Sequence, residues 1–326
     1  MTGYTSGAKI LADIIDDIAN ELIATAGGYW ADRESITIPD VLDAGTGKWT
    51  TANKTANNAK RCLVHRKGGI TQFITLEHIN NPQNFYYGNQ NWWYYGKGIR
   101  IRTSISWDNA TDEPPVDFQS NFLPIESGYN GNGVDMATLQ ITYFKWVDET
   151  GFVIMAKPEP TGNGYQQSVL LCVEHADTVE YSTGTSNFIV FSQGNMWSAL
   201  YDGNWGPNEW RNRCIIRPGS YQYPNHGSWS NYTFQNAGVS FIPTSSYYAF
   251  KSVGNGKVYY VKPIVHNHAG AWNPLFQINL FFPYSEGVGL IDGDVIAIEG
   301  DTKKYLCKAL SSPDSTARLV YAIRYN

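Results

Sequence analysis

The spacing of apolar positions changes near residue 28, and it predicts one helix before that point and strands after it. Near the start, apolar residues recur at steps of three and four, which places them on one helical face: Ile10, Leu11, Ile14, Ile15, Ile18 and Leu22. The opposite face is polar and carries Asp13, Asp16, Asp17, Asn20 and Glu21. We expect one amphipathic helix over residues 6–25, with Thr5 or Ser6 as its N-cap and Gly27-Gly28 as its stop.

After residue 28 the chain contains short runs rich in Val, Ile, Thr, Tyr and Phe, which suit a pleated, half-buried surface. We expect strands over residues 61–64, 72–79, 98–107, 137–145, 151–157, 168–174, 187–192, 238–242, 257–261, 276–282, 294–299, 304–310 and 318–324. A turn signal at 147–151 favours a hairpin, and the tail from Leu290 favours an antiparallel meander. The predicted fold class is mainly β: an antiparallel sandwich or barrel-like body with one N-terminal amphipathic helix and long aromatic-rich loops.

Four long stretches follow neither period, at residues 40–60, 81–97, 108–135 and 194–236. Loops of this length inside a compact domain are usually functional or are ordered by a partner. We divide the chain into 1–107, the helix plus a first β segment; 108–135, a loop or linker; and 136–326, a β-rich body that ends in the meander. One continuous domain is the alternative.

Composition narrows the class of protein. The chain has 326 residues, 24 Lys and Arg against 29 Asp and Glu, and a net charge of −5. Aromatic residues are 14% and charged residues 16%, which argues against disorder and against a coiled coil. The acidic balance argues against nucleic acid as a partner, and the lack of an apolar run of about 18 residues argues against membrane insertion. The first residues show no secretory signal, so we expect the chain to be made in a cytoplasm and to stay there until it is assembled.

No motif of an enzyme or a metal site is recognisable. The four cysteines lie far apart and are expected to be reduced thiols. His266 and His268 are the only close histidine pair, and no third ligand is evident beside them. Several carboxylates near aromatic residues are nominal acid–base candidates, but no spacing pairs any two of them: Glu77, Asp108, Glu174, Glu180, Asp202 and Glu209. We therefore predict no catalytic, cofactor-binding or metal-binding residue and no enzymatic activity.

The aromatic segments are the strongest functional signal. They lie among Asn, Gly and Ser, and the candidate contact residues in them are Trp92, Trp93, Tyr94, Tyr95, Trp205, Trp210, Arg211, Arg213, Tyr221, Tyr223 and Trp229. Trp, Tyr and Arg dominate the binding energy of protein interfaces, and large aromatic side chains also fill cores. Flat aromatic faces stack on sugar rings as well, but no sugar-specific motif accompanies them, so we favour the interface and core interpretations.

The chain as a whole resembles the structural proteins of tailed-bacteriophage virions, in particular tail, baseplate and collar components. The resemblance rests on YTSGAK at residues 4–9 leading into the helix, on the hairpin region 143–157, and on DGDVIAIE at 292–299 followed by KYLC at 304–307. It covers the whole length loosely. It implies a non-enzymatic protein, made in the host bacterial cytoplasm and located in the virion, that needs no cofactor and contacts other virion proteins and copies of itself.

Two alternatives belong to other functional classes. One is a carbohydrate-binding module for host adhesion, whose partner is a cell-surface glycan and whose aromatic residues stack on sugars. The other, weaker alternative is a glycoside hydrolase, in which two of Glu77, Glu174 and Glu209 meet in the folded chain.

Overall fold

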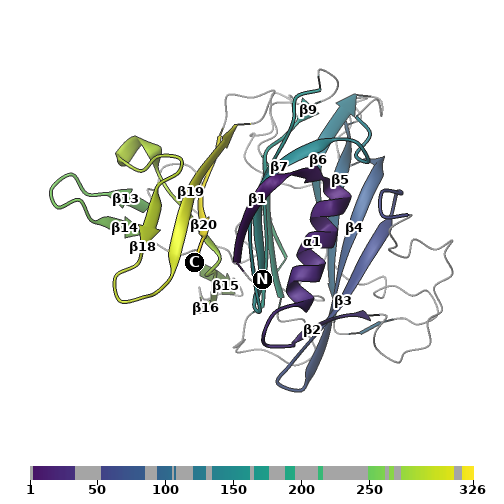
Figure 1. The fold of residues 1–326 in the computed structure, drawn as a ribbon, viewed down its shortest axis with the longest axis horizontal. Coiled ribbons are helices and arrows are strands. Elements are labelled where there is room, and N and C mark those ends of the chain that lie inside the picture. Colours follow the sequence, from purple (N-terminus) through teal and green to yellow (C-terminus); the bar gives the residue numbers. More distant parts are fainter. Residues whose placement is uncertain are drawn as a thin grey trace.

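The structure is a computed structural model that describes residues 3–33, 53–84, 94–104, 106–107, 120–129, 134–161, 165–175, 188–194, 212–215, 249–260, 264–267, 273–311 and 318–326. The described residues form antiparallel sheets and one α-helix near the N-terminus, which confirms the predicted fold class. Figure 1 shows the sheets stacked in layers, with the helix between two of the sheets. The expected strand at 238–242 lies outside the described residues.

The central sheet has six strands and lies in the middle of the stack. Its order is β1 (Gly3–Ile10), β7 (Gln140–Asp148), β8 (Gly151–Pro158), β10 (Val169–His175), β11 (Phe188–Gly194) and β12 (Asn212–Ile215). The predicted hairpin joins β7 to β8, where Asp148 is opposite Gly151. A Cβ on Gly151 would lie 1.9 Å from the backbone oxygen of Val173 in β10, so only glycine fits this close approach.

The outer sheet lies on one side of the central sheet. Its order is β2 (Trp30–Asp32), β3 (Ala59–Lys67), β4 (Ile70–Asn84), β5 (Tyr94–Ser104), β6 (Ser120–Tyr129) and β9 (Tyr165–Gln166). The expectation of a loop throughout 108–135 is wrong at 120–129, because β6 pairs with β5 along most of its length. The expected loop at 81–97 is likewise shortened by the end of β4 and the start of β5.

Helix α1 (Leu11–Ile23) closes the open side between these two sheets, next to β1 and β7 on one side and β3 and β4 on the other (Figure 1). Its predicted apolar stripe is buried in the core that the two sheets share, and burying each such side chain stabilises the fold by about 1.5–3 kcal/mol. From the sheets, this core receives residues such as Leu63, Ile74, Leu76, Ile101, Ile141, Phe152, Ile154, Leu171 and Val173.

The predicted helix start and stop are wrong. Residues 3–10 form strand β1, which pairs with β7 from Gly3 to Ile10, so the helix begins only at Leu11. Ile10 is the N-cap without a side-chain cap, and Thr5 and Ser6 lie in the strand. The helix ends at Ile23, four residues before the predicted Gly27-Gly28 stop.

The C-terminal sheet covers the other face of the central sheet. Its order is β17 (Phe281–Pro283), β20 (Arg318–Arg324), β19 (Lys304–Ser311) and β18 (Val295–Ala297), so the predicted meander is confirmed. A second core joins it to the central sheet: Trp146, Val153, Met155, Leu170, Cys172, Phe191, Leu280, Phe281, Leu310, Leu319, Tyr321 and Ile323. The short 3-10 helix η3 (Glu286–Val288) follows β17.

Two hairpins complete the described fold. They are β13 (Ala249–Lys251) with β14 (Val258–Tyr260), and β15 (Ile264–Asn267) with β16 (Asn273–Gln277). The first hairpin packs through Val258 and Tyr260 on a third core, formed by the far face of the C-terminal sheet. Strand pairing joins residues from different predicted segments. Strand β1, from segment 1–107, pairs in the central sheet, and β9, from segment 136–326, pairs in the outer sheet. The division at residues 107 and 136 stays a prediction.

Candidate functional site

The aromatic residues predicted as contacts fall mostly outside the described residues. This applies to Trp92, Trp93, Trp205, Trp210, Arg211, Tyr221, Tyr223 and Trp229. For Tyr94, Tyr95 and Arg213 the backbone is described: the two tyrosines begin β5, opposite the end of β6, and Arg213 lies in β12. Strand β6 pairs with β5 and also contacts β12, so the fold brings these two distant parts of the sequence to a common strand. Their role as contacts stays a prediction.

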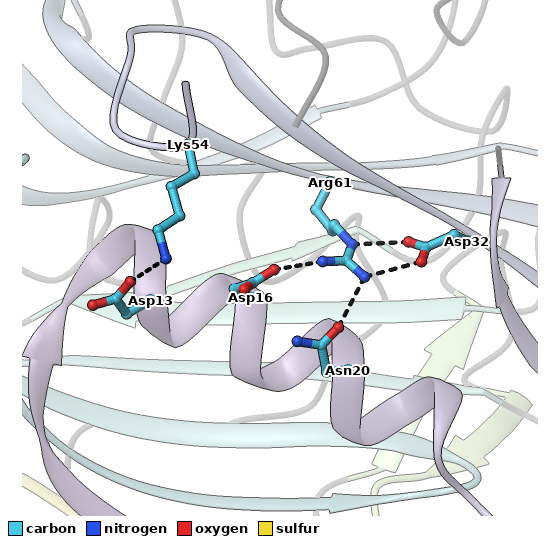
Figure 2. A network of polar contacts seen from close by, with 6 residues as sticks. All are labelled: Asp13, Asp16, Asn20, Asp32, Lys54 and Arg61. Carbon is cyan, nitrogen blue, oxygen red and sulfur yellow. Dashed lines mark hydrogen bonds and ion pairs between the residues drawn. The ribbon is translucent and has the colours of Figure 1, made fainter. Parts of the chain in front are cut away.

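The polar face of α1 is bound to the outer sheet through Arg61 of β3 (Figure 2). Its guanidinium donates to both carboxylate oxygens of Asp32, at 2.8 and 3.0 Å, to Asp16, and to Asn20 at 2.9 Å. Such forked contacts between guanidinium and carboxylate are the strongest hydrogen bonds that side chains form. The group therefore joins helix, β2 and β3 at one point.

Each of the four acidic side chains on α1 pairs with a different cation. Besides Asp16 with Arg61, Asp13 pairs with Lys54 at 2.6 Å and Asp17 pairs with Lys9 of β1 at 2.6 Å, while Glu21 pairs with Lys145 of β7. The side chain of Lys145 is fully buried. These pairs tie the polar side of the helix to both sheets, so its charged groups act in holding the layers together.

Glu174 forms a buried polar contact between the central sheet and the segment that leads into the C-terminal sheet. It lies on β10, two residues after Cys172, and thus on the face of the central sheet that packs on the C-terminal sheet. Its carboxylate accepts hydrogen bonds from the backbone N–H of Asn279 at 3.0 Å, from the Asn279 side-chain amide at 3.1 Å and from the N–H of Leu280 at 3.3 Å. The carbonyl of Asn279 in turn accepts from the Tyr305 hydroxyl of β19 at 2.7 Å.

Burial raises the pKa of Glu174 to about 7. The negative charge of Asp148 acts in the same direction, while the donors from Asn279 and Leu280 oppose it by stabilising the ionised form. A carboxyl group with this pKa changes its charge near neutral pH, which a solvent-exposed glutamate does not.

A second buried polar cluster lies between the central and outer sheets. The rings of His65 (β3) and His175 (β10) have centroids 4.4 Å apart, and Gln72 of β4 lies 3.2 Å from Nε2 of His175. Trp30 and Phe188 surround the pair. The sequence signal for this cluster was weak, because histidines inside apolar strands show no ligand spacing.

Glu77 and Glu174 do not form the carboxylate pair of a glycosidase. Glu77 contacts Arg100 at 3.3 Å and Arg102 at 3.6 Å on the face of β4 opposite to the core residue Leu76. Glu174 faces the C-terminal sheet. The two carboxylates therefore lie on the two outer faces of the pair formed by the outer sheet and the central sheet. Packed sheets are about 10 Å apart, whereas glycosidase carboxylates are about 5–9.5 Å apart. The third candidate, Glu209, lies outside the described residues.

The cysteines with described side chains are thiols. Cys62, Cys172 and Cys307 form no disulfide, and burial raises the pKa of Cys307 to about 12. Within the described ranges, no three His, Cys, Asp or Glu side chains lie close enough together to hold a metal ion. The part of the chain that the structure describes also contains no helix long and apolar enough to cross a membrane.

Comparison with known proteins gives no match: no protein-family model, curated protein or solved structure is similar to this chain.

Proposed function

We propose that this chain is a non-enzymatic structural component of a phage virion, of the tail, baseplate or collar, that assembles in multiple copies through its aromatic-rich loops. The proposal rests on the observation that buried ionisable groups of the described residues bind other parts of the fold. Arg61, Lys145 and Glu174, all largely or fully buried, each bind a partner from another layer of the fold. Polar contacts of this kind between layers stabilise the folded chain, as expected for the subunit of a larger assembly.

The exposed apolar side chains around the C-terminal sheet support association with other protein. Ile291 is 60% exposed, and Val295 of the edge strand β18 is 49% exposed. On the neighbouring hairpin region, Val253 is fully exposed and Tyr259 is 47% exposed. Edge strands that carry apolar residues tend to pair or pack with other chains unless they are covered. Copies of this chain or adjacent virion proteins would cover them in a particle.

Quantitative mass spectrometry of purified particles tests the proposal. The chain should be present at a fixed number of copies per particle, and particles of a phage from which its gene is deleted should be incomplete. Free chain that never co-purifies with particles, together with normal particles from the deletion strain, would refute it.

The carbohydrate-binding alternative rests on aromatic residues outside the described part of the chain. Binding of the purified protein to a glycan array, lost in Trp92→Ala and Trp205→Ala, would favour this alternative over an interface role for those residues.

A further inference from the structure

Two buried histidines meet where the outer sheet packs on the central sheet. In the strand register, His65 of β3 lies between Trp30 of β2 and Gln72 of β4. His175 ends β10, opposite Phe188 of β11. The centroids of the two imidazole rings are 4.4 Å apart, and all five of these side chains are buried. Because Trp30 and Phe188 belong to the core that the two sheets share, the histidine pair lies inside that core.

The Gln72 amide favours the uncharged form of one ring. Its side-chain nitrogen lies 3.2 Å from Nε2 of His175. An amide nitrogen only donates, so Nε2 accepts in this contact, and the hydrogen of the neutral ring is on Nδ1. A proton added at Nε2 would place two donors against each other. The hydrogen bond and the burial of the ring therefore act in the same direction, against a positive charge on His175.

Aromatic rings surround the histidine pair. The centroid of the Trp30 ring lies 4.7 Å from that of His65, and Phe188 contacts both imidazoles at 5.2 Å. An aromatic face attracts one cation. A second imidazolium 4.4 Å from the first would be repelled by it, in a buried environment that screens charge poorly. While the sheets are packed, the pair therefore holds at most one proton.

Charges of both signs lie on the elements around the pair. The ammonium of Lys67 is 5.2 Å from the centroid of the Tyr29 ring, which lies 5.9 Å from the ring of His65. The turn between β7 and β8 contributes two carboxylates, of Asp148 and Glu149. The lysine disfavours a proton on the pair and the carboxylates favour one, so these charges oppose each other. The contact between the two imidazoles then decides how many protons the pair holds.

We propose that His65 and His175 form an acid-sensitive contact, which holds the outer sheet on the central sheet near neutral pH and opens in acid. A histidine in water takes up a proton near pH 6.5, so the two separated side chains hold two protons below that pH. The packed pair holds at most one. Protons therefore favour the open state, and the contact weakens as pH falls. The proposed device follows from the packing of the two rings and is independent of a role in a virion.

The size of the effect follows from the difference in bound protons. A histidine with the usual pKa of about 6.5 is about one quarter protonated at pH 7 and almost fully protonated at pH 5. An open state that binds one proton more than the packed state therefore gains about 25-fold in population between these two pH values. A packed pair that holds no proton gives about the square of this factor.

Hydrogen exchange of the full chain, measured by mass spectrometry at pH 7 and pH 5 and corrected for intrinsic exchange, tests the proposal. Protection of β2 and β3 should fall by at least about 25-fold, while β19 and β20 change little. In His65→Phe the fall should be about 25-fold smaller, because His175 can then take its proton without a charged neighbour. Phe188→Leu, a control that loosens the same packing without removing a titratable group, should lower protection at both pH values and keep their ratio.

Gln72→Glu provides a second test that keeps both histidines, for the case in which His65→Phe does not fold. It replaces the amide donor beside Nε2 of His175 with a carboxylate that pairs with the protonated ring. Opening should then shift to lower pH, which a loss of packing cannot produce. A fall of wild-type size in His65→Phe, or an equal fall in β19 and β20, would overturn the proposal. Opening of Gln72→Glu at the wild-type pH or above it would also overturn it.

Discussion

Replacing Arg61 with Met tests how α1 is held against the outer sheet. The Arg61 side chain is 13% exposed, and Met retains most of its apolar stem while losing every donor to Asp16, Asn20 and Asp32. A hydrogen bond to a charged group contributes about 1.5–3 kcal/mol. Asp16 and Asp32 are 30% and 37% exposed and regain water in the variant, which reduces the loss. We expect Arg61→Met to lower the free energy of unfolding by about 2–3 kcal/mol.

Lys54→Met is the matched control, because it also removes one cation beside α1 and also changes the net charge from −5 to −6. Its partner Asp13 is 37% exposed, so the expected loss is about 0–1 kcal/mol. Urea unfolding followed by circular dichroism, at low salt and at about 1 M salt, measures both. The Arg61 effect should persist at high salt and the Lys54 effect should vanish. Equal losses in the two variants would refute the assignment of Arg61 as the main polar attachment of the helix.

Three further predictions follow from burial and close contact. Gly151→Ala should destabilise the fold by about 3 kcal/mol in urea unfolding, because the new Cβ meets the backbone of Val173; a loss under about 1 kcal/mol would contradict the hairpin geometry. Ile15→Ala should cost about 2–5 kcal/mol, whereas Ile291→Ala, at an exposed position, should cost less than about 0.5 kcal/mol; similar values for both would contradict the described core. Cys307 should resist an aromatic disulfide reagent at pH 8 until urea unfolds the chain, since its pKa is about 12; rapid labelling of the native protein would contradict its burial.

The sequence pattern was sufficient to predict an element where the residues of that element alone determine its structure. The apolar stripe predicted α1 and its buried face, and the residue types of β19 and β20 predicted these two strands of the meander. The β7–β8 hairpin was predicted from its turn residues, because Asp148 and Gly151 carry their turn chemistry locally.

Elements that depend on distant pairing were missed. Residues 3–10 lie next to a strongly helical stripe, yet their backbone pairs with β7, some 140 residues away in the sequence, and because of that pairing the helix begins only at Leu11. Strand β6 contains Pro124 and Gly128 and lacks a clear alternation, so its pairing with β5 and β9 defines it. The hydrogen bonds between Glu174 and Asn279 could not be foreseen either, since Asn279 is about 100 residues away in the sequence and Tyr305 in turn donates to its carbonyl.

A cryo-electron microscopy map of the native particle tests the proposed function most directly. The account predicts repeated copies of the body that the three sheets and α1 form. It also predicts that the copies contact each other at the aromatic segments that contain Trp92 and Trp205. A map with no density for this body, or one in which every copy presents those segments to solvent, would contradict it.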